Sequence, residues 1–164
     1  MSNAGYVPQK DLIKRGADLG ETGALLILTI ILSPIGAILW LIALRRLSKA
    51  YGSKTIWRNT LIAIIANVFA FLFGSIASAV PVSIGVPVII AMILASYAFT
   101  LLSGWLMRSV FNELRTLSNI EEFGKTAKWF WLGAILSIVI VGIILIWVGY
   151  YHARRGFKKL ANQQ

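Results

Sequence analysis

The chain has 164 residues, of which 58% are hydrophobic and 13% charged, and its mean hydropathy is +0.78. Soluble domains average about 45–50% apolar and about 25% charged residues, so this composition excludes an ordinary soluble domain and favours an integral membrane protein. The absence of cysteine excludes disulfides, thiol catalysis and thiolate metal sites. Sixteen Lys and Arg against six Asp and Glu give a net charge of +10. Because these cations flank apolar segments, we expect them to contact lipid headgroups and not nucleic acid.

Four apolar segments follow one another along the chain, and none contains Asp, Glu, Lys, Arg or His. They are residues 24–44, 60–80, 86–107 and 129–151. Each is long enough to cross a hydrocarbon core of about 30 Å as a helix that rises about 1.5 Å per residue. Residues 1–23 are expected to form a polar interfacial segment, and residues 152–164 a basic tail. We therefore predict an all-α, multi-pass protein of the cell membrane, with one domain over residues 24–151 built as a four-helix bundle.

Pro34, in the sequence SPIG, interrupts the first apolar segment. We expect a kink there, because proline removes one backbone donor and a helix bundle tolerates that loss. The alternative is a re-entrant hairpin at the same place, whose arms of about nine residues would be too short to cross. The second and third segments are joined by the uncharged link PVSIGVP, and prolines at both of its ends predict an antiparallel helical hairpin.

Two basic connectors resemble each other and indicate an internal repeat. Residues 44–57 read LRRLSKAYGSKTIW and residues 114–129 read LRTLSNIEEFGKTAKW. The aromatic-Gly pair in each copy is a signal that can end the preceding helix, and the Trp then begins the next one. Basic connectors can look alike by composition alone, but here order and spacing agree as well. We therefore favour two tandem helix-hairpin repeats.

The orientation of the chain depends on a small difference in charge. The connectors, residues 45–58 and 108–128, hold nine Lys and Arg, whereas the two termini hold seven. The positive-inside rule then predicts cytoplasmic connectors and termini on the outside. Eight basic residues are expected to contact lipid headgroups and fix this topology: Arg45, Arg46, Lys49, Arg115, Arg154, Arg155, Lys158 and Lys159.

Aromatic side chains prefer the depth of the membrane interface and are expected to mark its two sides. At one interface we expect Trp40, Trp57, Trp105, Trp129 and Trp131, and at the other Trp147, Tyr150 and Tyr151. One face of the second segment carries small residues at four-residue intervals, namely Ala66, Ala70, Gly74 and Ser78, beside the amide of Asn67. Such a face predicts close helix packing within the chain, with docking of another subunit as the alternative.

The sequence offers little chemistry for catalysis. Its single histidine, His152, lies beside Arg154 and Arg155 and is expected to contact headgroups. The pair Glu121-Glu122 lies in a lysine-containing connector, where a solvated surface is expected. One histidine and no cysteine make a metal site improbable. We therefore predict a non-enzymatic protein without metal or cofactor.

Three functions are compatible with these features. The leading hypothesis is an accessory or structural subunit of a larger membrane complex, such as a respiratory or other energy-converting assembly. Its expected partners are the lipid bilayer and other membrane protein subunits. The second is a small channel or carrier for an uncharged solute, with a polar path through Asn67, Ser96, Thr100 and Ser103. The third is an anionic-lipid-binding or membrane-shaping protein that uses the basic residues.

Three stretches of the sequence resemble an archaeal family of small multi-pass membrane proteins known only as a domain of unknown function. They are RGADLGETGALLILTIILSPIGAILWLIALRRLSKAYG, NTLIAII and FGKTAKWFWLGAILSIVIVGIILIWVGYY. The resemblance covers about residues 19–151 and is most specific at the Gly/Pro-interrupted first segment, at Leu47-Ser48 with Tyr51, and at Phe123 followed by Gly133-Ala134. It implies an archaeal source and a four-span fold, and it brings no activity or catalytic residues.

Overall fold

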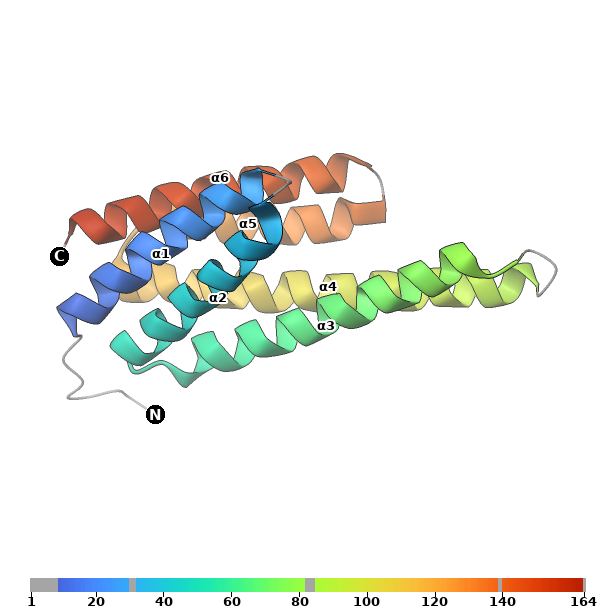
Figure 1. Cartoon of the computed structure of the whole chain (residues 1–164), viewed down its shortest axis with the longest axis horizontal. Coiled ribbons are helices and arrows are strands. Elements are labelled where there is room, and N and C mark those ends of the chain that lie inside the picture. The colour runs from blue at the N-terminus through green and yellow to red at the C-terminus, as the bar shows by residue number, and fades with distance from the viewer. Residues whose placement is uncertain (1–8, 30–31, 82–84, 139, 164) are drawn as a thin grey trace.

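A computed structural model describes residues 9–29, 32–81, 85–138 and 140–163, and within these residues the chain is all-helical (Figure 1). The helices are α1 (Lys10–Leu28), α2 (Ser33–Ala50), α3 (Lys54–Ala79), α4 (Val86–Ser118), α5 (Glu121–Ile135) and α6 (Ile140–Asn162), with the short 3-10 helix η3 (Leu136–Ile138) between the last two. The all-α prediction is confirmed for the described residues, which contain six α-helices and not four.

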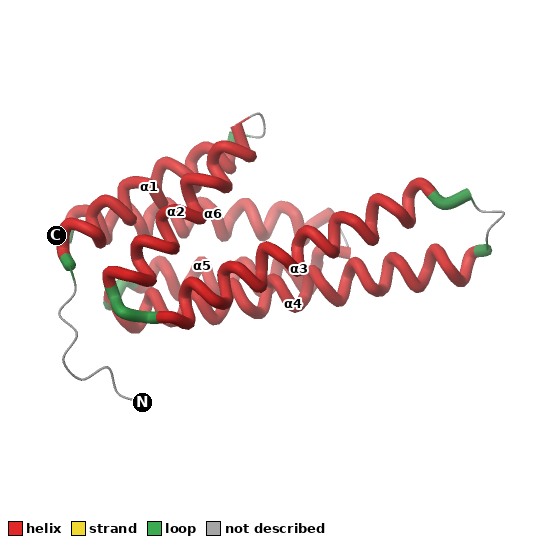
Figure 2. Tube along the Cα trace, turned by 60° about the horizontal axis from the view of Figure 1, so that its bottom comes forward, coloured by secondary structure: helices red, strands yellow, loops and turns green. Residues whose placement is uncertain are grey.

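The six helices form three antiparallel hairpins, α1/α2, α3/α4 and α5/α6. Figures 1 and 2 show that the start of α1, the end of α6 and both basic connectors lie at one end of the molecule, which we call the base. The tips of all three hairpins lie away from the base. The long hairpin, α3/α4, projects beyond the short hairpins, α1/α2 and α5/α6.

The first and fourth predicted segments are each broken in the middle, and this is why the number of helices differs from the prediction. In the first segment α1 ends at Leu28 and α2 begins at Ser33. Pro34 lies in the first turn of α2, where a missing backbone donor is harmless. Residues 30–31 lie outside the described residues. The helical hairpin that we considered as the alternative at SPIG is therefore the observed structure, and the expected kink is wrong.

The break in the fourth segment has no proline, and glycines allow it instead. The chain leaves α5 at Ile135, passes through η3 and turns back into α6. A Cβ atom on Gly142 would lie 2.3 Å from the backbone of Leu136, and one on Gly133 would lie 2.5 Å from the side chain of Ile146. Only glycine permits such close approach of the two arms. A matching pair closes the first hairpin, where Cβ atoms on Gly23 and Gly36 would lie 2.8 and 2.7 Å from each other's carbonyl oxygens.

Short connectors at the base turn the chain from one hairpin to the next. The first has Gly52 at φ 65°, and Ser53 then caps α3 by accepting a hydrogen bond from the Ile56 N–H. The second ends α4 with Asn119 at φ 57°, a left-handed conformation that asparagine tolerates. The two repeat copies therefore end their helices differently, because Gly124, which we expected to end a helix, lies inside α5.

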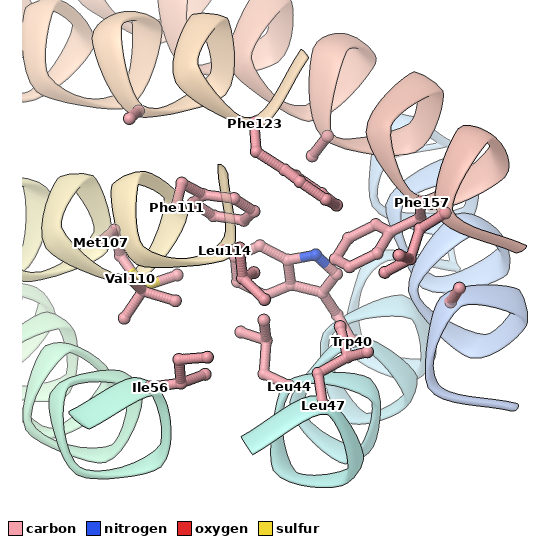
Figure 3. Packing of buried hydrophobic residues seen from close by; sticks show 14 of the residues in the cluster. Trp40, Leu44, Leu47, Ile56, Met107, Val110, Phe111, Leu114, Phe123 and Phe157 are labelled. Atoms are coloured by element: carbon pink, nitrogen blue, oxygen red, sulfur yellow. The ribbon is translucent and has the colours of Figure 1, made fainter. Parts of the chain in front are cut away.

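An aromatic core joins the three hairpins in the half of the molecule nearer the base (Figure 3). Trp40 of α2 stacks on Phe111 of α4 with ring centroids 5.7 Å apart, and Phe123 of α5 contacts Phe157 of α6 at 5.3 Å. Each fully buried side chain of this size stabilises the fold by about 1.5–3 kcal/mol. The hairpins are therefore fixed to one another near the base, while the tip of α3/α4 extends beyond the other hairpins.

Candidate functional site

The surface of the molecule is divided into a charged end and an apolar end. All sixteen Lys and Arg and all six Asp and Glu lie in residues 10–21, 45–58, 108–128 and 154–159, and these segments meet at the base (Figure 1). Large hydrophobic side chains are exposed toward the tips of every hairpin. Examples are Ile35 and Ile38 of α1/α2, Val68, Phe71 and Leu94 of α3/α4, and Ile138, Ile143 and Ile144 near the tip of α5/α6. Phe71 is the most exposed of them, at 74%.

Such a large exposed apolar surface marks an interaction site with lipid or protein. Within the described residues, α3 and α4 are the two helices that are long and apolar enough to cross a membrane. The predicted segments 60–80 and 86–107 correspond to them. α3 and α4 also form the long hairpin that the proline-flanked link predicted, although residues 82–84 of that link lie outside the described residues.

Ion pairs fasten the helices together at the base. The carboxylate of Glu122 is buried and accepts a hydrogen bond of 2.6 Å from the Lys159 ammonium, which joins α5 to α6. This hydrogen bond is the main cause that lowers the pKa of Glu122 below its ordinary value. Arg154 of α6 lies 3.7 Å from Glu21 of α1. The prediction of a solvated surface therefore holds for Glu121, which is exposed, but not for Glu122, which is buried in an ion pair. The sequence did not reveal this difference.

Several basic residues border aromatic rings at the edge of the apolar surface. Arg45 lies over Trp57 at 5.4 Å and Arg155 over Tyr151 at 5.9 Å. A third pair, Arg108 over Trp131 at 5.8 Å, was not among the predicted headgroup residues. All eight predicted headgroup residues lie at the base. Three of them, Arg115, Arg154 and Lys159, also bind carboxylates of the chain.

The aromatic residues are not divided between two ends as predicted. Tyr150, expected opposite Trp40, lies against it with ring centroids 5.5 Å apart, and it also contacts Phe130 at 4.9 Å. The α5/α6 turn reverses the chain and brings Gly149 back beside Trp129, so that a Cβ atom on Gly149 would lie 3.5 Å from the Trp129 side chain. For the same reason the start of α1 and the end of α6 lie beside the basic connectors, whereas we expected the termini at the opposite end.

The small-residue face of α3 packs partly against α4, as the plainer interpretation predicted. Ala66 and Ala70 are buried, and the Ser96 hydroxyl donates a 2.7 Å hydrogen bond to the carbonyl of Ala70. The Asn67 amide donates a 2.7 Å hydrogen bond to the Ser103 hydroxyl. Farther toward the tip the face opens into a shallow groove between α3 and α4. It is lined by Asn67, Ala70, Phe71, Gly74, Ser75, Ser78, Ser96 and Thr100.

A cavity of about 400 Å³ lies where the three hairpins diverge, and side chains from all six helices line it. Trp40, Phe130 and Tyr150 form its aromatic wall, and Asn67 and Ser103 are among its few polar residues. Its buried lining comes mainly from α4 and α5. Its exposed lining comes from α2 and α3, at Ala37, Ile64, Asn67, Val68 and Phe71. The cavity therefore opens sideways between α2 and α3, which diverge from their common turn (Figures 1 and 2).

This cavity could not be predicted from sequence, because its lining residues are spread over all six helices and most of them look like ordinary apolar positions. Among the described residues, no three His, Asp or Glu side chains lie close enough together to hold a metal ion. The apolar cavity and the divided surface are therefore the features on which a function can be argued.

Comparison with known proteins gives a family and one relative. Residues 32–150 match the family described as a protein of unknown function (DUF996). The chain is also 26% identical over 150 residues to the uncharacterized protein MJ1644 of the archaeon Methanocaldococcus jannaschii. This match covers 82% of this chain and 85% of the relative. No solved structure matches the chain. The resemblance to a family of unknown function is thus confirmed, and the relative is archaeal, while the described residues form three helical hairpins in place of the four-span fold that the resemblance implied.

Proposed function

Because the chain belongs to the DUF996 family of proteins of unknown function, its function has to be argued from its own geometry, and we propose that it is a non-enzymatic integral membrane protein that shapes the bilayer. In this proposal all three hairpins insert from the same side. The long hairpin crosses the bilayer, and the short hairpins stop inside it. The observation that carries the proposal is the division of the surface, with every charged residue at the base and exposed apolar side chains toward every tip.

Helix lengths support two different depths of insertion. At about 1.5 Å per residue, the uncharged residues 60–79 of α3 and 86–107 of α4 extend about 30 Å, the thickness of the hydrocarbon core. The uncharged parts of α2, residues 33–44, and of α6, residues 140–151, extend only about 18 Å. The short hairpins therefore reach little more than half of the core, and the leaflet next to the base holds six helices where the far leaflet holds two.

This unequal occupancy makes the inserted protein a wedge. A helix with its side chains is about 10 Å across and covers about 80 Å² of membrane area. Four additional helices in one leaflet then add about 300 Å² to that leaflet for each molecule. A bilayer relieves such an excess by bending, with the base on its convex side.

Charge gives the orientation that the sequence alone left almost undecided. Because the two terminal segments lie at the same end as the connectors, all sixteen Lys and Arg are at the base and none is at the tips. The positive-inside rule then puts the base in the cytoplasm, where its cations also meet anionic headgroups. Exposed cations such as Arg45, Arg155 and Lys158 are the ones available for such contacts.

The depth of insertion is tested by cysteine labelling, for which a chain without cysteine is well suited. Single-cysteine variants Lys158→Cys, Pro81→Cys and Ser137→Cys report on the base, the tip of the long hairpin and the tip of a short hairpin. In sealed membranes, an impermeant maleimide should label Lys158→Cys from the cytoplasmic side and Pro81→Cys from the outside. Ser137→Cys should react only after the membrane is dissolved. Labelling of Ser137→Cys from the outside would mean that α5/α6 crosses the bilayer, and the wedge would not exist.

Membrane shaping itself is tested with purified protein in vesicles, whose diameters are measured by electron microscopy at increasing protein content. Vesicle diameter should fall, or tubules should form, with the unchanged chain and with Ile138→Ala. In Ile138→Lys, a charge at the tip of α5/α6 costs about 2.5–3.5 kcal/mol in the core of the bilayer. That charge should pull the short hairpin toward the surface and weaken the bending. Equal curvature with both variants, or none with the unchanged chain, contradicts the proposal.

The accessory-subunit hypothesis remains a second candidate, and the groove on the projecting part of α3/α4 favours it. This groove is lined by small and hydroxyl-bearing side chains, which suit close packing of a helix from another protein. A photo-crosslinker at Ser78, which is exposed in the groove, should capture a membrane protein in native membranes. The same crosslinker at Leu94, which is exposed outside the groove, should not. Equal capture, or none, at the two positions counts against a specific partner.

The geometry gives less support to a channel or carrier. The four polar residues of the expected path satisfy one another or the backbone, since Asn67 binds Ser103, and Thr100 donates to the carbonyl of Ser96. Groups that are already paired, within α4 or between α3 and α4, favour a packing role over the exchange of water or solute.

A further inference from the structure

We infer that the lateral cavity between α2 and α3 holds the hydrocarbon chain of a bilayer lipid, an inference that rests on the proposed insertion of the protein into the membrane. The cavity measures about 400 Å³, within the range of small-molecule sites. Its mouth is bordered by five exposed residues, Ala37, Ile64, Asn67, Val68 and Phe71. Four of them are apolar, and the Asn67 amide already donates a hydrogen bond to Ser103, so the mouth suits a hydrocarbon ligand better than a polar solute from water.

The position of the mouth decides where the ligand comes from. Ala37 lies within residues 33–44 and Ile64 within residues 60–79, the uncharged parts of α2 and α3 that face hydrocarbon in the inserted protein. A lipid chain already surrounds this opening and needs no passage through water to enter it. A cavity left empty there would expose aromatic and aliphatic walls without contact partners, which is unfavourable.

The interior of the cavity suits a chain and offers little to a headgroup. Trp40, Phe130 and Met107 form broad apolar walls, and Asn67 and Ser103 already bind each other across the space. A feature that suits a headgroup lies outside the cavity, near the turn between α2 and α3. There Arg45 stacks on Trp57 at the edge of the charged base. A lipid with its chain between α2 and α3 therefore has its headgroup on the side of this cation.

Tryptophan fluorescence can detect the chain directly, because brominated lipid chains quench a nearby indole. Trp40 lines the cavity but is only 6% exposed, so lipid reaches its ring mainly through the cavity. Trp105 is 55% exposed on the outer face of α4 and reports ordinary contact with lipid. The experiment uses two variants of the full chain in vesicles of phosphatidylcholine with brominated chains. One keeps only Trp40 and the other only Trp105, with phenylalanine at the other tryptophan positions.

Both variants should lose fluorescence relative to the same vesicles without bromine. Ala37→Phe places a ring in the mouth of the cavity and should restore the fluorescence of Trp40. Ala98→Phe, which adds the same ring at an exposed position of α4 outside the cavity, should leave Trp40 quenched. A second measurement uses the protein with all of its tryptophans. Mass spectrometry measures the amount of lipid that stays bound through purification, and this amount should fall with Ala37→Phe and not with Ala98→Phe.

The outcomes separate this inference from the proposed function. Quenching of Trp105 without quenching of Trp40 means that the protein is inserted but its cavity holds no chain, which overturns the inference alone. Equal quenching of Trp40 with Ala37→Phe and Ala98→Phe means that bromine reaches the indole by another route, and this also overturns it. If neither tryptophan is quenched, the protein is not inserted, and both the inference and the proposed function fail.

Discussion

Two glycines of α6 allow a sharp test of how the short hairpins are made. Both are buried, but a Cβ atom on Gly142 would lie 2.3 Å from the Leu136 backbone, whereas one on Gly149 would meet Phe130 at an ordinary 3.5 Å. In Gly142→Ala the arms of α5/α6 must therefore separate by about 1 Å before the contact becomes tolerable. In Gly149→Ala nothing has to move.

The magnitudes follow from these two distances. Overpacking a well-packed site costs about 1–3 kcal/mol, and we expect the upper end for Gly142→Ala because the obstacle is backbone and cannot rotate away. Replacing glycine by alanine inside a helix otherwise gains up to about 1 kcal/mol, which is the expected result for Gly149→Ala. Unfolding of the two variants with increasing denaturing detergent, followed by circular dichroism, measures the difference. If Gly142→Ala is as stable as Gly149→Ala, the arms do not approach as closely as the structure has them, and glycine is not what closes the hairpin.

Two further predictions concern polar contacts. The pKa of Glu122 is lower in the folded protein than its ordinary 4.5, so its pair with Lys159 stabilises the fold at neutral pH, and this contribution is lost as the pH falls below about 4.5 toward the folded pKa. Glu122→Gln should therefore cost about 1 kcal/mol at pH 7, a value discounted because Lys159 is half exposed, and thermal melts should show a smaller difference at pH 3 than at pH 7. Asn67→Ala should cost about 0.6 kcal/mol, the average for a hydrogen bond between membrane helices, and a double-mutant cycle with Ser103→Ala should recover most of that value as coupling. Additive effects of the two substitutions would show that the hydrogen bond contributes nothing.

The long hairpin was predictable from sequence because length and hydropathy determine it almost alone. Residues 60–80 and 86–107 fall within α3 and at the start of α4, and prolines flank the link between them. The short hairpins were missed because an apolar segment has the same composition whether its helix continues or turns back. A local signal was nevertheless present. Gly23 and Gly36 lie at nearly equal distances before and after one turn, and Gly133 and Gly142 do so around the other. Two arms that pack closely need their glycines at such matched positions.

The candidate site was predicted only in part. The eight cations lie near the base, whereas we expected them on two opposite sides, and their contact with lipid headgroups stays a prediction. The aromatic positions were misplaced because each unrecognised turn reverses the direction of the chain. Tyr150 thus lies beside Trp40 and not at the opposite end. The cavity was beyond prediction, because its wall depends on the relative positions of six helices.

The two helix breaks, between α1 and α2 and between α5 and α6, together determine where the charged residues lie, and this links the fold to the proposed function. A single break in either predicted segment would put one terminus beside the basic connectors and leave the other at the far end. Two breaks bring both termini to the base, so the cations of residues 10–15 join those of residues 154–159 on one surface. In the proposed insertion no basic residue has to be carried across a bilayer, because only the uncharged tip of α3/α4 would reach the far side. The same two turns that shorten four helices to about half the membrane thickness thus also collect the positive charge on one side. A protein with continuous helices in their place would have neither the wedge nor a single charged face.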